Sequence, residues 1–308
     1  MRTIAAIRTH VWGEEARRLH AQLAPVFGAD LVVVFHNRPA GLDLPLPVVD
    51  IDDAWVAGQG LRVLPDWGWR CGDYFLYALR AARPDADRFW LIEPDVYFSA
   101  DPAPLFARLE TSPEDALGVR IEPLPANDVF MRHAGGRQLH RAIFAFTRWS
   151  APVLDWLFDL RRRYSADLDP ARKPLNDECF CFTHLVEQDR FTHADMAERA
   201  PGLISPAAML TDPDILMGMV RDDLGSIVHH PVRERAGFVA TVALRLATRA
   251  IKHNDFILPA LPYLSEAEVR DICLRVGAQL EPHLLQERMR QLRRRRRVAI
   301  EQEGNHHA

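Results

Sequence analysis

Hydrophobic residues in the first half of the chain fall into short apolar runs that are separated by segments with helical spacing. The runs are rich in β-branched and aromatic residues and favour buried strands, whereas apolar residues three or four positions apart favour helices. Strands are expected at Thr3–Ile7, Leu31–Phe35, Val48–Ile51 and Phe89–Ile92, and helices at Glu14–Phe27 and Asp73–Ala82. Strands that alternate with helices predict βαβ units with right-handed connections around a parallel-type sheet.

The second half mixes strands and helices and then turns mostly helical. Further strands are expected at Ala116–Glu122, Ala142–Thr147 and Ser226–Val232, and helices at Val153–Tyr164, Asn176–Val186, Val239–Ile251, Glu266–Leu274 and Pro282–Ile300. Ser150 is expected to cap the helix that follows it, and Pro231 to stop the last strand. The pattern predicts a main domain over residues 1–235 and a helical extension over 236–308.

Composition narrows the class of protein. The chain has 308 residues, 48% of them hydrophobic and 26% charged, as in ordinary globular proteins. A net charge of −4 gives no reason to expect a nucleic-acid partner. The four cysteines lack CxxC spacing, so free, buried thiols are expected. There is no signal-peptide pattern and no apolar run of about 18 residues, which predicts a cytoplasmic location.

An acidic pair follows one of the predicted strands. Glu93 and Asp95 come directly after Phe89–Ile92, with Pro94 between them. In open α/β sheets, ligands gather at the carboxyl ends of strands. Two carboxylates one residue apart can hold a divalent cation against a substrate phosphate. A solvated acidic turn after a core strand is the alternative.

Two further clusters hold carboxylate and imidazole groups. Asp177 and Glu178 open a predicted helix, and His229 and His230 end a predicted strand. Such ligands suit Mn²⁺, while carboxylates together with phosphate oxygens also suit Mg²⁺. Each cluster has a structural alternative. Asp177 would complement the helix dipole, and one histidine of the pair is expected to face the core because strand side chains alternate.

The order of these features resembles the GT-A glycosyltransferases over roughly residues 1–235. The matching positions are Glu93 and Asp95, Asp177 or Glu178, and His229 or His230 before Pro231-Val-Arg233. The resemblance implies an α/β fold, a three-layer α/β/α sandwich with a mixed, mostly parallel central sheet. It also implies that the acidic pair binds the metal on a sugar-nucleotide, that a carboxylate at a helix start acts as base, and that a late histidine completes the metal site.

The family pattern and the chemistry of a nucleotide-sugar donor together assign a role to each candidate residue. Asp95, His229 and His230 are the expected metal ligands, for Mn²⁺ or Mg²⁺. Either Asp177 or Glu178 is the expected base, with Asp177 preferred. Glu93 departs from the usual aspartate, so it is expected to reach the metal through water or to contact the ribose. The expected donor-binding residues are Arg8, Asp52, Trp69, Arg70, Asp73 and Glu93.

The predicted function is therefore metal-dependent transfer of a sugar from a nucleotide-sugar donor to a glycan, lipid-linked or other hydroxyl acceptor. Inversion of configuration is favoured, and bacterial-type envelope or polysaccharide synthesis is the expected setting. A non-catalytic nucleotide- or glycan-binding protein and a metal-dependent hydrolase are the alternatives. Seven arginines between Arg288 and Arg297 indicate either a solvated helix end or a peripheral contact with anionic lipid at the inner face of a membrane.

Overall fold

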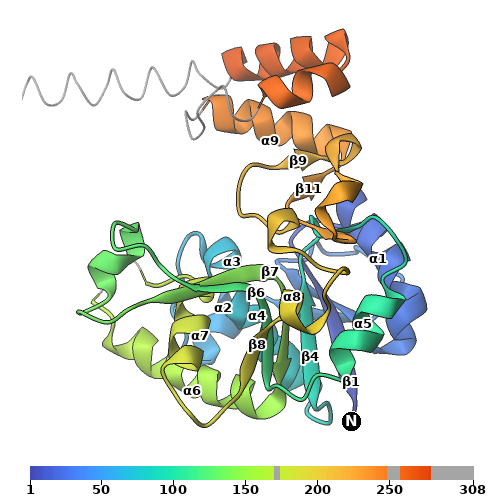
Figure 1. Cartoon of the computed structure of the whole chain (residues 1–308). Coiled ribbons are helices and arrows are strands. Elements are labelled where there is room, and N and C mark those ends of the chain that lie inside the picture. The colour runs from blue at the N-terminus through green and yellow to red at the C-terminus, as the bar shows by residue number, and fades with distance from the viewer. Residues whose placement is uncertain (170–173, 248–256, 279–308) are drawn as a thin grey trace, which may run out of the picture. The chain divides into compact units, whose positions relative to one another are not determined.

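The computed structural model describes residues 1–169, 174–247 and 257–278 (Figure 1). These residues form two compact units. The first consists of Met1–Asp212 together with Val220–Val232, and the second consists of Pro213–Met219 together with the chain from Arg233 onward. The candidate chemistry predicted from the sequence lies in the first unit, so its architecture is described first.

A seven-stranded sheet forms the centre of the first unit, in the order β3-β2-β1-β4-β7-β6-β8. The strands are β1 (Thr3–Thr9), β2 (Leu31–His36), β3 (Val48–Ile51), β4 (Arg88–Ile92), β6 (Ala116–Pro123), β7 (His140–Ser150) and β8 (His193–Asp195). β1 pairs in parallel with β2 and β4, β2 with β3, and β6 with β8. Only β7 runs antiparallel to its neighbours β4 and β6. The predicted mixed, mostly parallel sheet is confirmed.

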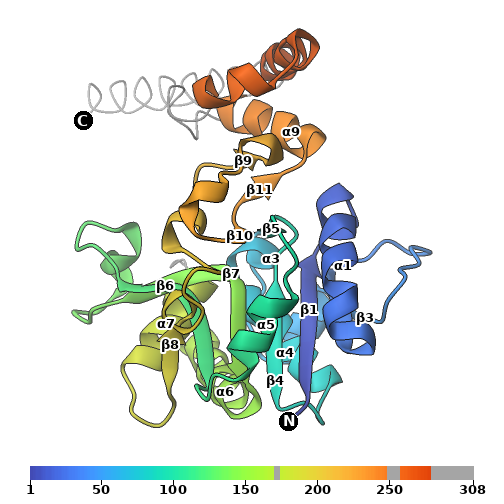
Figure 2. The same cartoon turned by 45° about the vertical axis from the view of Figure 1, so that its right-hand side comes forward.

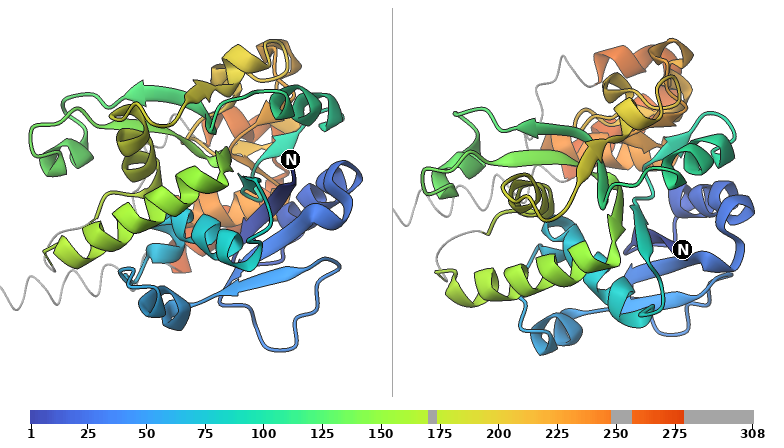
Figure 3. Two further views of the ribbon diagram at one scale, coloured as in Figure 1. Left: turned by 90° about the horizontal axis from the view of Figure 1, so that it is seen from below. Right: turned by 60° about the horizontal axis from the view of Figure 1, so that its bottom comes forward.

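Helices cover both faces of this sheet because its strands are apolar on both sides. Along β1, Ile4 and Ala6 belong to one hydrophobic core, and Ala5 and Ile7 belong to the other. The first core packs under α4 (Gly72–Ala82), α6 (Ala151–Asp167) and α7 (Asp177–Val186), and the second under α1 (Glu14–Phe27), α5 (Ala103–Glu110) and α8 (Met196–Arg199). The predicted three-layer α/β/α arrangement is confirmed (Figures 2 and 3).

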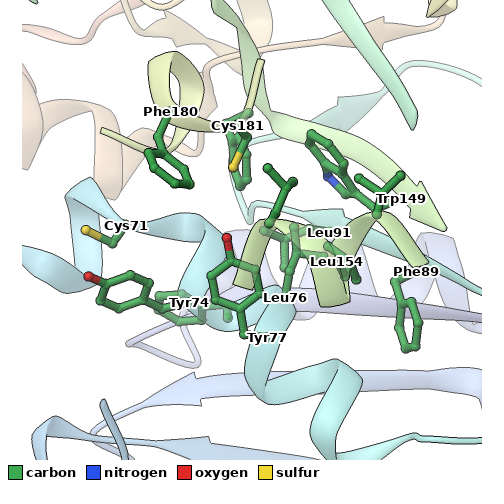
Figure 4. Close-up of a cluster of buried hydrophobic side chains, with 14 of the residues drawn as sticks. Cys71, Tyr74, Leu76, Tyr77, Phe89, Leu91, Trp149, Leu154, Phe180 and Cys181 are labelled. Atoms are coloured by element: carbon green, nitrogen blue, oxygen red, sulfur yellow. The ribbon is translucent and has the colours of Figure 1, made fainter. Parts of the chain in front are cut away.

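The core beneath α4, α6 and α7 is rich in aromatic side chains and contains the thiols. Figure 4 shows Cys71 and Cys181 among tyrosine, tryptophan and leucine side chains from α4, β4, β7 and α6. All four cysteines are free, as predicted, but only Cys71, Cys179 and Cys181 are buried; Cys273 is exposed. Buried thiols in apolar surroundings act as small hydrophobic residues, so these three contribute packing.

Two local predictions are corrected by the structure. Ser150 stands at the N-cap of α6, yet its hydroxyl makes no capping bond and instead contacts the Asp115 carboxylate at 3.1 Å. The single strand expected at Ser226–Val232 is two short strands, β10 (Val228–His229) and β11 (Val232–Arg233), with a cis His230–Pro231 bond between them. β10 pairs with β5 (Tyr97–Phe98), and β11 pairs with β9 (Ile215–Leu216).

The second unit is mostly helical, with α9 (Arg235–Ala247), the 3₁₀ helix η6 (Leu258–Tyr263) and a helix over residues 266–278. Its small core includes Phe238, Val242 and Ile272. The buried Asp214 carboxylate lies 2.8 Å from the guanidinium groups of both Arg233 and Arg245. The helix predicted at Pro282–Ile300, and the arginines within it, lie outside the described residues. Within the described ranges, no helix is long and apolar enough to cross a membrane.

Candidate functional site

The candidate residues gather where the order of strands reverses in the sheet. From β1 the chain builds outward to β2 and β3, and it then returns to place β4 on the other side of β1. Open α/β sheets bind ligands in the crevice at such a switch point, outside the carboxyl ends of the strands. Arg8 lies near the carboxyl end of β1, and Glu93 and Asp95 follow β4. The topology therefore explains why these charged side chains meet.

Glu93, Asp95 and His230 form a cluster of possible metal ligands. One ligand atom from each lies within 4.8 Å of the others. The backbone of Asp95 is fixed by a hydrogen bond, because its carbonyl accepts from the Val232 amide at 2.8 Å. The His230 backbone is bonded on both sides, to the Ala208 carbonyl and the Leu210 amide. The three side chains therefore come from backbone segments that are already fixed.

The hydrogen bond that His230 makes through Nδ1 leaves Nε2, the nitrogen that could bind a metal, on the side of the Asp95 carboxylate. Its Nδ1 lies 2.6 Å from the Leu210 carbonyl and donates to it, so in the neutral ring Nε2 carries the lone pair. Nε2 lies 3.5 Å from Asp95 Oδ1. Burial alone would lower the pKa of His230, but the Asp95 and Glu93 carboxylates raise it, and the net shift is upward. A histidine oriented by a carbonyl through Nδ1 is a common arrangement for metal ligation through Nε2.

His229 does not join this cluster. Its Nε2 lies 3.3 Å from Ser99 Oγ, and its ring lies near that of Tyr97, the strand neighbour to which it is paired. Successive side chains of an extended backbone point to opposite sides. Of the two predicted histidines, the structure brings only His230 together with Glu93 and Asp95 within the described residues.

Arg8 is buried and contacts residues of α3, of α7 and of the segment after β4. Its Nη1 pairs with Glu93 and lies 3.5 Å from the Asp177 carboxylate, and its Nη2 donates to the carbonyls of Gly68 and Trp69, both at 2.9 Å. Only 7% of its surface is exposed. Because these contacts lie inside the protein, Arg8 orients the two carboxylates. The structure does not support the prediction that Arg8 binds the donor directly.

Asp177 is also fully engaged in local contacts. Its Oδ2 accepts from the Gly72 amide at 2.6 Å and its Oδ1 from the Glu178 amide at 2.8 Å. Asn176 caps the same helix by accepting from the Cys179 amide at 3.1 Å. Burial, followed by the nearby Glu178 and other carboxylates, raises the pKa of Asp177 although Arg8 opposes the shift. The side chain thus ties the start of α7 to the start of α4.

Gly72 is required for this junction, although no pattern in the sequence points to it. A Cβ atom at Gly72 would lie 2.3 Å from Arg8 Nη1 and 2.5 Å from Asp177 Oδ2. Gly72→Ala is therefore expected to lower the free energy of unfolding by about 1–3 kcal/mol, as overpacking does. Urea denaturation would measure the change. Gly58→Ala is the matched control, because nothing lies within 4 Å of a Cβ there and no loss is expected. Equal stability of the two variants would contradict the close packing.

Glu178, in the first turn of α7, has a half-buried side chain and lies close enough to Glu93 and His230 for both to act on its carboxyl group. Asn176 Nδ2 donates to its Oε2 at 3.3 Å. Burial and the nearby Glu93 carboxylate raise the pKa of Glu178 to about 7, against the opposing effects of Asn176, His230 and Arg141. A carboxyl group that titrates near neutrality is suited to proton transfer. On this geometry Glu178, rather than the preferred Asp177, is the better candidate for a base.

The remaining predicted donor-binding residues divide into two kinds. Trp69 lies on α3 (Trp67–Arg70) with 75% of its surface exposed, and its carbonyl accepts from Arg8, so its backbone lies beside the site. Arg70 is buried and paired with Asp66 at 2.8 Å. Asp52 follows β3 and serves as N-cap of α2 (Asp53–Gly58), where it accepts from the Trp55 amide at 2.7 Å. Arg70 and Asp52 therefore stabilise local structure through these contacts.

The structure does not support the prediction that Asp73 binds the donor. Its side chain is completely buried and forms two bonds with Arg161 of α6, at 2.7 and 3.0 Å. Arg161 also donates to the Leu175 carbonyl at 3.0 Å, and its guanidinium lies over the Phe180 ring. An enclosed carboxylate cannot contact a ligand, so Asp73 joins helices instead of binding a donor.

Comparison with known proteins gives weak similarities. No family model and no curated protein matches the chain. Among solved structures, the galactosyltransferase LgtC in complex with donor and acceptor sugar analogues is similar at 8% identity and a TM-score of 0.41, covering 71% of this chain and 76% of that one. A glycosyltransferase involved in glycosylation of the major capsid of PBCV-1 has 8% identity and a TM-score of 0.37, covering 65% and 84%. Mouse xyloside xylosyltransferase 1 has 13% identity and a TM-score of 0.36, covering 63% and 84%.

All three proteins are glycosyltransferases, the class that the sequence resembles. Similarity at this level does not place the chain in a family. The assignment below therefore depends on the strand order, the ligand cluster and the carboxyl group that faces it.

Proposed function

We propose that this protein is a metal-dependent glycosyltransferase that moves a sugar from a nucleotide-sugar donor to a hydroxyl acceptor. The observation that carries the proposal is the meeting of Glu93, Asp95 and His230 at the β1–β4 switch point, with Glu178 facing them. A diphosphate donor carries negative charge, and an ionised acceptor oxygen must be formed. The cluster and the half-buried carboxylate are suited to these two requirements.

The ligand set is suited to a divalent cation. Asp95 and His230 would hold it, with Glu93 as a third ligand that also pairs with Arg8. One nitrogen and two carboxylates favour Mn²⁺, and Mg²⁺ is the alternative where phosphate oxygens complete the shell. When bound, the cation would offset the charge that builds up on the leaving diphosphate.

Glu178 is proposed to accept the proton of the acceptor hydroxyl. The acceptor oxygen forms a bond to the anomeric carbon, the bond from that carbon to the diphosphate oxygen breaks, and a nucleoside diphosphate leaves with the electron pair. Attack from the face opposite the leaving group would invert the configuration. Asp177 is not given this role, because both of its oxygens already accept backbone hydrogen bonds. Trp69 is proposed to offer its exposed ring to the donor.

Glu178→Gln is expected to reduce kcat by about 10²–10⁴-fold while donor binding is retained. A base must be ionised, and the raised pKa means that the carboxylate exists mainly above about pH 7. Wild-type kcat should therefore rise with pH through that range, and the rise should disappear in the variant. Glu187→Gln, at the other end of the same helix, is the matched control with unchanged kcat. Full activity of Glu178→Gln would exclude this residue as the base.

Thermal-shift measurements with UDP-, GDP-, CMP- and dTDP-sugars test the proposed function as a whole. Stabilisation by one nucleotide sugar, only with Mn²⁺ present, is expected because a ligand that binds the native state raises its stability. Donor binding without turnover on any acceptor would favour a binding protein. Donor cleavage by water with no transfer to any acceptor would favour a hydrolase. No stabilisation by any donor would contradict the proposal.

We further propose a glycan or lipid-linked acceptor in envelope or polysaccharide synthesis, with the protein in the cytoplasm at the inner face of a membrane. The seven arginines in Arg288–Arg297 support this, since each basic residue near an anionic surface contributes about 1 kcal/mol. Residues 1–235 would then carry the site and 236–308 the membrane contact. In vesicle flotation, a chain lacking 288–308 should be recovered less with anionic liposomes than the intact chain. Equal recovery would contradict the membrane contact.

A further inference from the structure

The β6–β7 hairpin projects beyond the carboxyl end of β4. Ile92, the last residue of β4, pairs with Phe146, so the first part of β7, before Phe146, continues past the end of its neighbour. This part of β7 stays paired with β6, through Val119–Ile143 and then through Glu122–Arg141. The hairpin therefore forms a wall on the side of the sheet where Glu93 and Asp95 lie.

Arg120 has an unusual backbone within this wall. Its φ is +59°, in the left-handed region that residues with a Cβ rarely adopt, and it lies at a β-bulge between Val119 and Glu122. The Asp195 carboxylate holds the distorted segment, accepting from the Arg120 amide at 2.7 Å and from the Ile121 amide at 3.3 Å. Bulges often redirect a side chain beside an active site. The conformation thus points to a function for the Arg120 side chain.

Arg120, Glu122 and Arg141 form a half-buried cluster on the hairpin. Glu122 Oε1 accepts from Arg120 Nη2 at 3.2 Å, and from Arg141 Nε and Nη2 at 3.1 and 2.8 Å. Two guanidinium groups carry ten N–H donors. In the described part of the chain, three of these are bonded to Glu122. The cluster has a net charge of +1, and Glu122 holds the two arginines together.

The cluster lies at a fixed position relative to the proposed chemistry. The Ala145 carbonyl accepts from the Glu93 amide at 2.9 Å, and Arg141 is four residues earlier on the same strand. At about 3.4 Å per residue this separates the backbone of Arg141 from that of Ala145 by roughly 14 Å along the strand. His140 is also bonded to Thr183 of α7, the helix that begins with Glu178. Arg141 is close enough to Glu178 to counter the effect of burial on its pKa.

We propose that Arg120 and Arg141 bind a carboxylate or phosphate group on the acceptor, so that the substrate of the transfer is an acidic saccharide or a phosphorylated carrier. This inference rests on the proposed function, because it takes Glu178 to mark the acceptor side. Paired guanidinium groups match the geometry of such oxyanions through parallel N–H···O bonds. Glu122 would keep the two forks aligned before the acceptor arrives.

The test is calorimetric binding of three probes to the full chain: methyl β-glucuronide, glucose 6-phosphate and neutral methyl β-glucoside. One of the two anions is expected to bind at least about tenfold more tightly than the neutral sugar, since hydrogen bonds to charged groups are strong. Which anion is preferred distinguishes a carboxylate from a phosphate. Arg141→Gln and Arg120→Gly should each remove most of the preference. Glycine is used at residue 120 because it adopts a positive φ without strain.

Arg137→Gln is the matched control. It removes one charge from the same hairpin, but Arg137 pairs with Glu187 and lies outside the cluster. Equal binding of the neutral and anionic sugars, or an anion preference that survives Arg120→Gly with Arg141→Gln, would overturn the inference. Thermal stabilisation by nucleotide sugars is measured on the same samples. Failure of the anion site and failure of the proposed function can then be told apart. Anion preference without any donor binding would leave the anion site supported and the proposed function contradicted.

Discussion

Asp95→Asn is expected to lower Mn²⁺ affinity by more than about 100-fold and to abolish measurable sugar transfer. The substitution keeps the size of the side chain and removes the charge that faces His230 Nε2 at 3.5 Å. Changes in the outer shell of a metal site alone cost 10–100-fold in affinity, so loss of a direct ligand should cost more. The backbone bond from Val232 to the Asp95 carbonyl does not depend on the side chain, so the fold should be retained.

Isothermal titration with Mn²⁺ and a transfer assay on the same sample would measure both effects. His230→Gln is expected to resemble Asp95→Asn, whereas His229→Gln should bind metal as the wild type does, because His229 faces Ser99. The two adjacent histidines thus serve as a matched pair. Metal binding that is lost in His229→Gln and kept in His230→Gln would overturn the ligand assignment.

The pH dependence of metal binding follows from the same contact. His230 must be neutral to bind a metal, and the nearby carboxylates raise its pKa despite the burial that lowers it. Protons therefore compete with the metal, and affinity should fall as pH falls through this raised pKa.

Much of the sheet could be predicted because its strands are apolar runs, most of which are buried on both faces. Val48–Ile51 and the helix Glu14–Phe27 have the predicted bounds, since an apolar run or an apolar stripe marks each of them. The segment from Ser226 to Val232 could not be predicted as well. Its residues look like one strand, but they pair with two different partners, Tyr97–Phe98 and Ile215–Leu216, which the local pattern does not contain.

The candidate site was predictable in its ligand types but not in its contacts. Glu93, Asp95 and His230 follow from chemistry and order along the chain. The choice between His229 and His230 depends on the Leu210 carbonyl, 20 residues away. The hydrogen-bonded partners that give Arg8 and Asp73 their roles are 60 to 88 residues distant in sequence. Contacts of this kind leave no periodic signal, so charged residues near the site were predicted as donor ligands.

Asp73→Ala is expected to lower the free energy of unfolding by about 3–5 kcal/mol, because it leaves the buried Arg161 guanidinium without its counter-charge. Both side chains are at most 1% exposed, and two hydrogen bonds join them. The pair links α4 to α6, and Arg161 also holds the Leu175 carbonyl just before α7. The melting temperature should fall by on the order of 10 °C in a domain of this size.

The same two helices offer a matched control at the protein surface. Arg80 of α4 pairs with Asp155 of α6 at 3.0 Å, but the Asp155 side chain is 58% exposed. Asp155→Ala should cost only about 0–1 kcal/mol, because an exposed ion pair contributes little. Urea denaturation of both variants would separate the effect of burial from the effect of losing a charge pair. Similar losses in the two variants would mean that Arg161 finds another partner or water, and that the buried pair does not hold these helices together.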